Sequence, residues 1–537
     1  MTIKTIQLIS SILLFFPILL PAQSVLDQGS ALPLFVVDTD GSDILNEPKT
    51  EAHLGIIYTP DSLNYLTDIF NIYDGRIGIE IRGNGTVNLD KVSYLFETQL
   101  ENGENNNVSL LEFPEENDWV LYGPYIDKSL LRNVLTYDLA RAMGYYASRV
   151  QPCELVINGD YLGVYIFMEK IKRDKNRVDL KKFDDPNMLP SEGGFLFKID
   201  SWWNSNIGWQ SATYNVEGQE RKWNYHYLYP KANEITEGQK SYLKNFVDNF
   251  ENNLLSLQET GNPAVYDLID IENFADYFII NELAKNPDAY RLSTYLHKDA
   301  ESEDDRLKLG PVWDYNFGFS NYWDYKNRPS GWEYDNHWWD FPDQIPFWWS
   351  VLLEDPYFTN ILKERWTLWR NSVINCANFT SQIDHWKSLI SPAAERNFTR
   401  WPVLGQPHIL DWYVGDTYAE EVDYLNNWIC QRIAWMDQEL DYLDTDIPPI
   451  FDAQSYSVYP NPAVNYLIIQ SQDTFPNYLH TVRVYDPYQR LQWEETLVPQ
   501  FNDNKIHIAL PNLTTGIFIL ELSSTQSSTR WKFFHKN

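Results

Sequence analysis

The alternation of apolar and polar residues predicts strands in the N-terminal part of the chain. Residues 75–82 (GRIGIEIR) place apolar side chains at every second position, as a half-buried strand does, and a second strand is expected over 92–99. A short apolar strand over 34–37 precedes both. Beyond them, apolar residues recur at helical spacing, which predicts a helix from Asp127, a favourable N-cap, to about Met143.

A hairpin is the clearest local feature of the sequence. Two strongly apolar runs, 150–157 and 161–168, flank Asn158-Gly159-Asp160, which has the composition of a tight turn. Another strand is expected over 193–199, and two helical segments follow, one reaching residue 248 and one over 270–283. Mixed strands and helices predict an α+β fold for the main part of the chain.

The pattern changes twice in the second half. Residues 320–440 are rich in Trp and mostly helical, and they end in a long amphipathic segment over 418–443. A Pro-containing linker, 444–455, follows. From residue 456 onward, short strands separated by turn residues predict a small all-β sandwich of about 80 residues. The expected strands are 466–470, 482–485, 492–497, 505–509, 516–522 and 529–534.

Residues 281–318 carry the most informative chemistry. A helix end runs into Asn286-Pro287-Asp288, and two β-patterned segments, 292–298 and 307–313, follow around an acidic loop. The second segment leads directly into Asp314. A loop Asp with a nearby Asn, a hairpin and then a second Asp is the layout of a kinase active site. There, one carboxylate orients the attacking hydroxyl, while the Asn and the second carboxylate hold Mg²⁺ on the phosphates.

The N-terminal half offers groups that suit a phosphate. Arg82 with Gly83-Asn84-Gly85 puts a cation and a flexible backbone at a strand end, and Lys91 opens the next strand. Taken alone, this pattern is also that of an ordinary hairpin. Glu169-Lys170 end an apolar strand, where they could form the ion pair of a nucleotide pocket or simply reach solvent.

Length and charge limit the function classes. A chain of 537 residues is too long for one core of typical size, so two or more domains are expected. A formal net charge of −33 would repel a phosphate backbone, which argues against nucleic-acid binding.

The N-terminus has the pattern of a secretory signal peptide. Lys4 supplies the positive charge, residues 8–20 the apolar stretch and Ala22 a small residue for cleavage, so residues 1–22 are expected to be removed. A buried N-terminal helix is the alternative. No later run approaches 18 apolar residues, so no membrane span is expected.

The cysteines and histidines exclude several site types. Three cysteines are too few for a disulfide framework; Cys376 and Cys430 could pair, but buried thiols fit equally well. Nine scattered histidines form no zinc motif, and the sequence lacks a Walker loop, a nucleophile elbow and a dinucleotide fingerprint.

Several motifs, in order, resemble the spore-coat-H-type (CotH) kinase family. They are IEIRG at 79–83, KxSY from Lys91, Arg132-Asn133, ARxMG at 140–144, VINGxYxGVY at 156–165, EKI at 169–171, KNxDAY at 285–290 and GPxWD at 310–314. The resemblance covers about residues 35–440. It implies an atypical, two-lobed protein-kinase-like fold over residues 23–443, with a core at about 75–350 and a helical extension over 350–443.

The resemblance also implies roles for single residues. Asp288 becomes the catalytic carboxylate and Asp314 the principal metal ligand, with Asn286 as a second ligand and Asn316 as a weaker candidate. Arg82 and Lys91 become candidates for phosphate contact, and Glu169 for ion pairing in the nucleotide pocket. The implied cofactors are ATP and Mg²⁺ or Mn²⁺.

A rival interpretation comes from the Trp-rich block. Its tryptophans could line a glycan-binding surface and its acids could hydrolyse glycosides, although clustered tryptophans are more often core. The residues concerned are Trp332, Trp338, Trp339, Trp348, Trp349, Glu333, Asp335 and Asp340.

The C-terminal module resembles the type IX secretion sorting domain of Bacteroidetes-like bacteria. The matching segments are YPNPA at 459–463, VxVYD at 482–486, LxxGIF at 513–518 and KFF at 532–534. It implies export through the periplasm by the type IX machinery, followed by release or attachment at the cell surface.

The sequence therefore predicts an exported kinase that transfers the ATP γ-phosphate to a hydroxyl on a protein. ATP is scarce outside the cell, so a non-catalytic kinase-fold module that binds a glycan or protein at the surface is the alternative.

Overall fold

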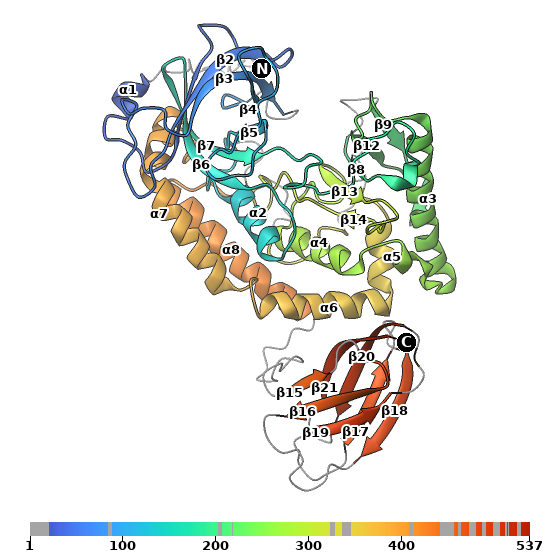
Figure 1. Ribbon diagram of the computed structural model, residues 1–537. Helices are drawn as coiled ribbons and strands as arrows, with labels where there is room; N and C mark the ends of the chain where they lie inside the picture. Colours follow the sequence, from blue (N-terminus) through green and yellow to red (C-terminus); the bar gives the residue numbers. More distant parts are fainter. Residues whose placement is uncertain are drawn as a thin grey trace, which may run out of the picture. The chain divides into compact units, whose positions relative to one another are not determined.

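The chain forms two compact units, Met1–Tyr442 and Leu443–Asn537, in the computed structural model (Figure 1). The first unit is described over residues 21–83, 89–201, 207–216, 219–322, 328–335, 345–407 and 412–440. The second is described over residues 456–459, 463–471, 480–485, 490–497, 505–510, 513, 515–523 and 528–536. The apolar stretch of the expected signal peptide lies outside the described residues, and Ala22 begins a short helix, α1 (Ala22–Val25).

A closed seven-stranded barrel begins the first unit. Its strands follow the order β1-β2-β3-β4-β5-β7-β6, antiparallel except where β1 pairs with β6. Their bounds are β1 (Leu34–Asp38), β2 (Thr50–Ile57), β3 (Tyr73–Arg82), β4 (Ser93–Thr98), β5 (Asp118–Tyr122), β6 (Val150–Ile157) and β7 (Asp160–Glu169). The predicted strands and hairpin are confirmed, whereas β2, β5 and the closure into a barrel were not predicted.

Strand β7 explains why its sequence is apolar at almost every position. Tyr165 and Phe167 point into the barrel core, while Val164, Ile166 and Met168 belong to the neighbouring core of the helices. Successive side chains of a strand face opposite sides, so a strand buried on both faces shows a continuous apolar run.

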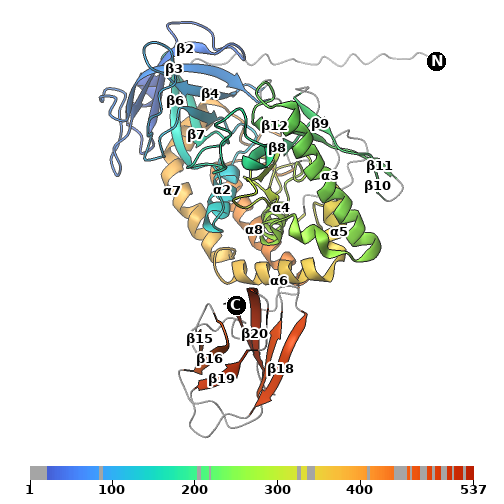
Figure 2. The same cartoon turned by 45° about the vertical axis from the view of Figure 1, so that its right-hand side comes forward.

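A five-stranded sheet forms the second part of this unit, in the order β14-β13-β8-β12-β9. Its strands are β8 (Phe195–Ile199), β9 (Gly208–Gln210), β12 (Asn224–Tyr229), β13 (Thr294–Lys298) and β14 (Lys308–Leu309). A separate two-stranded ribbon, β10 (Tyr214–Val216) and β11 (Gln219–Arg221), stands out beside α3 in Figure 2. Together with the helices, these sheets confirm an α+β protein.

Helices surround this sheet and link it to the barrel. They are α2 (Arg132–Ala142), α3 (Glu237–Thr260), α4 (Ile271–Ala284), α5 (Trp348–Glu354), α6 (Pro356–Arg370), α7 (Cys376–Arg400) and α8 (Tyr418–Glu439). Two 3₁₀ turns, Pro190–Glu192 and Pro263–Asp267, complete the described elements. A disulfide between Cys376 and Cys430 joins α7 to α8, and Cys153 is a buried free thiol.

Several predicted elements were wrong in extent, and the helix expected to reach residue 248 continues to Thr260. The helix expected from Asp127 begins at Arg132, because the Asp127 carboxylate accepts bonds from the backbone N–H of Ser129 and Arg132 and holds a turn there. The strand expected over 307–313 spans only two residues, since Gly310 adopts a φ of 111° and Pro311 lacks an N–H to continue the ladder.

The described tryptophans of the proposed glycan-binding block lie in the core or pack against it. Trp348 and Trp349 on α5 are each 1% exposed, and Trp332 packs against the same core. Trp338, Trp339 and Asp340 lie outside the described residues. The described members of the block therefore favour packing over a glycan-binding surface.

The second unit contains two facing sheets. One has the order β15-β16-β19 and the other β18-β17-β20-β21, and apolar residues from both form one core. The strands are β15 (Tyr456–Tyr459), β16 (Tyr466–Ser471), β17 (His480–Tyr485), β18 (Leu491–Leu497), β19 (Lys505–Ala509), β20 (Gly516–Ser523) and β21 (Ser528–His535). The predicted small β region is confirmed, with β15 as an additional strand.

The contact between β7 and α7 gives the first testable prediction. Gly163 has a φ of 90°, and a Cβ added there would overlap Asn397 Oδ1, which accepts the Val164 N–H at 3.1 Å. Gly163→Ala should lower the free energy of unfolding by about 2–4 kcal/mol, from backbone strain plus the clash. Thermal and urea unfolding would measure the loss.

Gly144→Ala is the matched control, because Gly144 also has a φ of 90° but an added Cβ would meet nothing within 4 Å. This substitution should lower the free energy of unfolding by only about 1–2 kcal/mol. Equal losses of unfolding free energy in the two variants would contradict the proposed clash between residue 163 and Asn397.

Candidate active site

The structure brings the two predicted carboxylates onto adjacent loops. Helix α4 ends at Ala284, Lys285 adopts the left-handed conformation with a φ of 44°, and the chain turns into Asn286 and Asp288. Asn286 is 3% exposed and joins the two loops: its Nδ2 donates to Asp314 O at 3.2 Å, and its Oδ1 accepts from Asp288 N at 3.3 Å. Asn286 therefore fixes the spacing of the two acidic residues.

Helix α2 holds the loop that carries Asp314. The Tyr137 hydroxyl accepts from Asp314 N at 3.2 Å, and Asn133 Oδ1 accepts from Tyr315 N at 2.7 Å. Arg132 Nε donates to Gly318 O at 3.0 Å. These bonds maintain Asp314 at a φ of 68°, a conformation that costs a non-glycine residue about 1–2 kcal/mol.

Burial and the charges of other predicted residues perturb the pKa of Asp314. Burial, and after it the negative charge of Asp288, raises the pKa of Asp314 to about 6, whereas Arg82 opposes the shift. A charge acts on a pKa in this way only at short range. These effects agree with the hydrogen bonds of Asn286, which join the loops of Asp288 and Asp314.

Arg82 reaches this place from the end of β3. Its guanidinium carbon lies 5.3 Å from the ring centroid of Trp313, the residue before Asp314. The Trp313 ring stacks on Tyr137, with centroids 6.0 Å apart, and contacts Tyr295 of β13 at 6.3 Å. Arg82 of the barrel and the loop that carries Asp314 are therefore linked through the aromatic side chain of Trp313.

Two further charged residues were not predicted. Asp200 raises the pKa of Asp314 and Lys198 lowers it, both to a smaller extent than Asp288 and Arg82. They lie at the end of β8, where Lys198 pairs in register with Tyr295. The only sequence signal for these two residues was the segment FLFKID at 195–200, an apolar strand that ends in alternate charged residues.

A family model described as CotH kinase protein matches residues 79–436, more than half of the chain. The chain belongs to the CotH kinase family. A second model, described as a secretion system C-terminal sorting domain, matches residues 457–536. The sorting domain supports export to the cell surface or beyond.

Other comparisons add little. No curated protein matches the chain. The crystal structure of CopC from Methylosinus trichosporium OB3b covers 15% of this chain and 93% of its own, with 8% identity and a TM-score of 0.13, which carries no argument. Among the described residues, no helix is long and apolar enough to cross a membrane.

Lys91, a phosphate-contact candidate in the CotH resemblance, is 1% exposed. Its Nζ donates to Val164 O at 2.5 Å and to Asn397 Oδ1 at 2.7 Å, so it ties β7 to α7. Burial lowers the pKa of Lys91 well below its usual value. These contacts favour a structural role, and they do not support the predicted phosphate contact.

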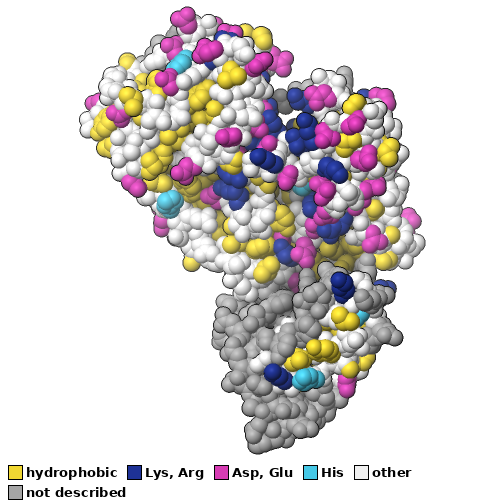
Figure 3. Space-filling model, viewed as in Figure 1, with side chains coloured by type: hydrophobic (Ala, Val, Ile, Leu, Met, Phe, Trp, Pro, Cys, Tyr) yellow, Lys and Arg dark blue, Asp and Glu magenta, His cyan; other side chains and the backbone are white. Residues whose placement is uncertain are grey.

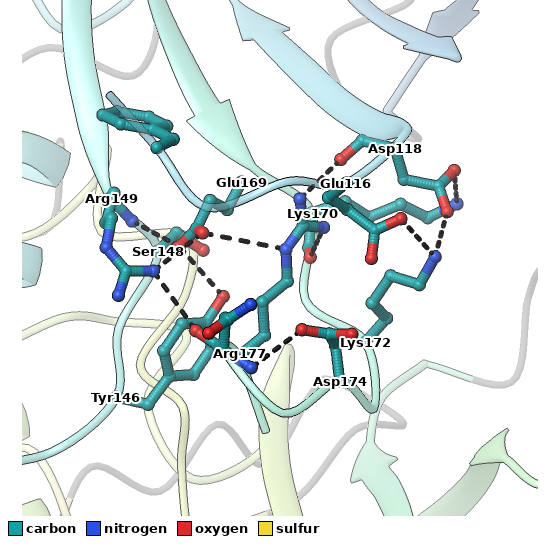
Figure 4. Close-up of polar contacts among 12 residues, drawn as sticks. Glu116, Asp118, Tyr146, Ser148, Arg149, Glu169, Lys170, Lys172, Asp174 and Arg177 are labelled. Atoms are coloured by element: carbon teal, nitrogen blue, oxygen red, sulfur yellow. Dashed lines mark hydrogen bonds and ion pairs between the residues drawn. The ribbon is translucent and has the colours of Figure 1, made fainter. Parts of the chain in front are cut away.

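Glu169 does form buried ion pairs, but with arginines (Figure 4). Its carboxylate accepts from Arg149 Nη1 at 2.8 Å and from the Tyr146 hydroxyl at 3.2 Å, and Arg177 Nε lies 3.8 Å away. Lys170, its neighbour, instead faces Asp118 at 3.3 Å. The network fixes the segment that leaves the barrel, and the predicted pairing of Glu169 in a nucleotide pocket stays a prediction.

The remaining candidates are placed only in part. Asn316 is 7% exposed, and its carbonyl accepts from Asn321 Nδ2 at 2.7 Å. Gly83 has a φ of 102°, while Asn84 and Gly85 lie outside the described residues. A cavity of about 370 Å³ lies elsewhere, between the end of α2, one face of α4 and β14.

A divalent cation fits the donors at the two loops. The described residues contain no group of three or more His, Cys, Asp or Glu side chains that could hold a metal. Asp314 and the Asn286 amide nevertheless supply hard oxygen donors, and Mg²⁺ needs few of these because phosphates and water complete its shell. The Asn286 oxygen already accepts the Asp288 N–H, so a second lone pair would serve the metal.

The raised pKa of Asp314 predicts a pH-dependent stability in metal-free protein. The pKa is about 6 in the folded chain and 3.8 for the unperturbed group, so the protonated carboxyl favours folding below about pH 4 and this stabilisation is lost as pH rises through 6. Asp314→Asn cannot ionise. It should be about 1–3 kcal/mol more stable than wild type at pH 8 and nearly equal to it at pH 4.

Urea unfolding in EDTA at pH 4, 6 and 8 would measure this difference. Asp305→Asn, in the loop between β13 and β14, is the control and should show no such pH trend. A variant of Asp314 that is less stable than wild type at pH 8 would contradict the electrostatic interpretation.

Proposed function

We propose that this exported CotH-family protein is a kinase that transfers the γ-phosphate of ATP to a hydroxyl, with a protein as the acceptor. The observation that carries the proposal is geometric: Asn286 joins the loops of Asp288 and Asp314 by hydrogen bonds, and Arg82 lies over the ring of Trp313, the residue before Asp314. Two carboxylates and one cation, brought to one place from separate segments, match parts that phosphoryl transfer uses.

Each residue receives a role from its position. Asp314, with a pKa of about 6, is mostly ionised at neutral pH, so it can hold a divalent cation together with the Asn286 amide. The bound cation would neutralise phosphate charge. Asp288 orients the acceptor hydroxyl, and its carboxylate is steered by Arg291, whose Nη2 lies 3.0 Å from Asp288 Oδ1.

The two parts of the first unit correspond to kinase lobes in this proposal. The barrel contributes Arg82 from β3, while the five-stranded sheet and its helices contribute both carboxylates. Lysine and arginine side chains gather where the barrel meets this sheet (Figure 3), although the whole chain carries a net charge of −33. A local positive region in an acidic protein suits a polyphosphate ligand.

Nucleotide binding is the first test. Isothermal calorimetry with ATP and Mg²⁺ should show binding to wild type, a loss of at least about tenfold in Arg82→Met, and no metal-dependent binding in Asp314→Ala. Lys91→Met is the matched control, because Lys91 is engaged by Val164 and Asn397, and it should bind ATP as wild type does.

Failure of the wild-type protein to bind nucleotide would remove the kinase proposal and leave the non-catalytic surface-binding alternative. A loss of ATP binding in Lys91→Met, with the fold intact, would support the original prediction that Lys91 contacts phosphate.

Phosphoryl transfer is the second test. With γ-labelled ATP, wild type should label itself or an added protein, while Asp288→Asn should bind ATP normally but transfer at least about a hundredfold more slowly. Glu303→Gln, exposed in the loop between β13 and β14, is the control and should transfer normally. Equal rates in Asp288→Asn and wild type would exclude Asp288 from the reaction.

A further inference from the structure

Lys198 and Asp200 form an ion pair at the end of the central strand β8. Their side chains are only 21% and 17% exposed, and the ammonium contacts the carboxylate directly. Lys198 pairs in register with Tyr295 on one side and with His226 on the other. The pair therefore lies at the C-terminal end of the central strand, with two strands of the sheet on either side of it.

The Lys198 ammonium also lies against the aromatic groups beside Asp314. It is 5.9 Å from the ring centroid of Tyr295, whose ring is 6.3 Å from that of Trp313. Arg82 lies over the other member of this ring pair, 5.3 Å from the Trp313 centroid. Two cations, one from β3 and one from β8, thus flank the Tyr295–Trp313 pair, and Trp313 is covalently joined to Asp314.

A largely buried Lys–Asp pair contributes little net stability. The cost of removing two charges from water offsets most of their attraction, and apolar residues of similar size would serve the fold as well. Arg82 and Lys198 instead lie over the two rings of the Tyr295–Trp313 pair, next to the acidic loop. The arrangement fits an anion that approaches Asp314 between the two cations better than it fits a purely structural bond.

We propose that Lys198 is a second phosphate-binding cation of this site, and that Asp200 is the anion it exchanges for a phosphate group. The ligand class is a di- or triphosphate, whose oxygens would replace the Asp200 carboxylate on the ammonium. The inference rests on the proposed function, because it assumes that the site takes a polyphosphate. It adds Lys198 and Asp200 to the groups that select this ligand.

Calorimetry with three probes would test the exchange: Mg²⁺–ATP, pyrophosphate and adenosine. Lys198→Met should weaken Mg²⁺–ATP and pyrophosphate binding at least about tenfold, because a charge-assisted bond is lost, and leave adenosine binding unchanged. Lys198→Arg should keep most of the affinity. Lys308→Met is the control: Lys308 is a half-buried cation of the same sheet, 2.9 Å from Asp304, and its loss should change no affinity.

Asp200→Asn provides a second variant that keeps Lys198. Removal of the competing carboxylate should tighten pyrophosphate binding at least about threefold, whereas a merely structural ion pair would give unchanged or weaker binding. This variant decides the proposal even where Lys198→Met does not fold.

The outcomes separate this inference from the proposed function. Unchanged Mg²⁺–ATP and pyrophosphate affinity in a folded Lys198→Met, with loss in Asp314→Ala, would overturn the role of Lys198 and leave the kinase proposal standing. Wild-type binding of pyrophosphate but not ATP, lost in Lys198→Met, would support the anion site while removing the kinase. No binding of either probe to wild type would overturn both.

Discussion

A buried ion pair between Arg132 and Asp127 is the interaction on which the candidate site depends. Arg132 Nη1 lies 2.5 Å from Asp127 Oδ1, and both side chains are almost fully buried. The same arginine donates to Gly318 O, and its helix also supplies Asn133 and Tyr137 to the Asp314 loop. Loss of either partner would leave an unpaired buried charge, and the loop would lose its support at a strained φ.

A second buried pair fixes the other acidic loop in the same manner. Arg432 of α8 and Glu282 of α4 are both 0% exposed, and Arg432 also donates to the carbonyls of Pro329 and Gly331. Glu282 accepts from the hydroxyl of Tyr290, two residues beyond Asp288. Helices that are distant in the sequence therefore converge on the loop that carries Asp288. The Cys376–Cys430 disulfide, which joins α7 to α8, suits the oxidising surroundings of an exported protein.

The sequence offered candidates for the site only where the signal is local. Asp288 and Asp314 were predicted because they follow a helix end and a β-patterned segment, and Arg82 because it ends a strand beside glycine. Lys91 had the same local appearance as Arg82, yet it is buried between β7 and α7. Whether a strand-end cation faces a ligand or a helix depends on a partner, here Asn397, that is 306 residues away.

By itself, the sequence determined many of the strands and helices, the export module and the two acidic loops, because periodicity and turn chemistry act over a few residues. The closure of seven strands into a barrel, the meeting of Arg82 with Asp314 and the place of Lys198 and Asp200 were decided only by tertiary structure. Such contacts join segments separated by a hundred or more residues. Their free energy comes from packing and burial of charge, for which a short stretch of sequence carries no signal.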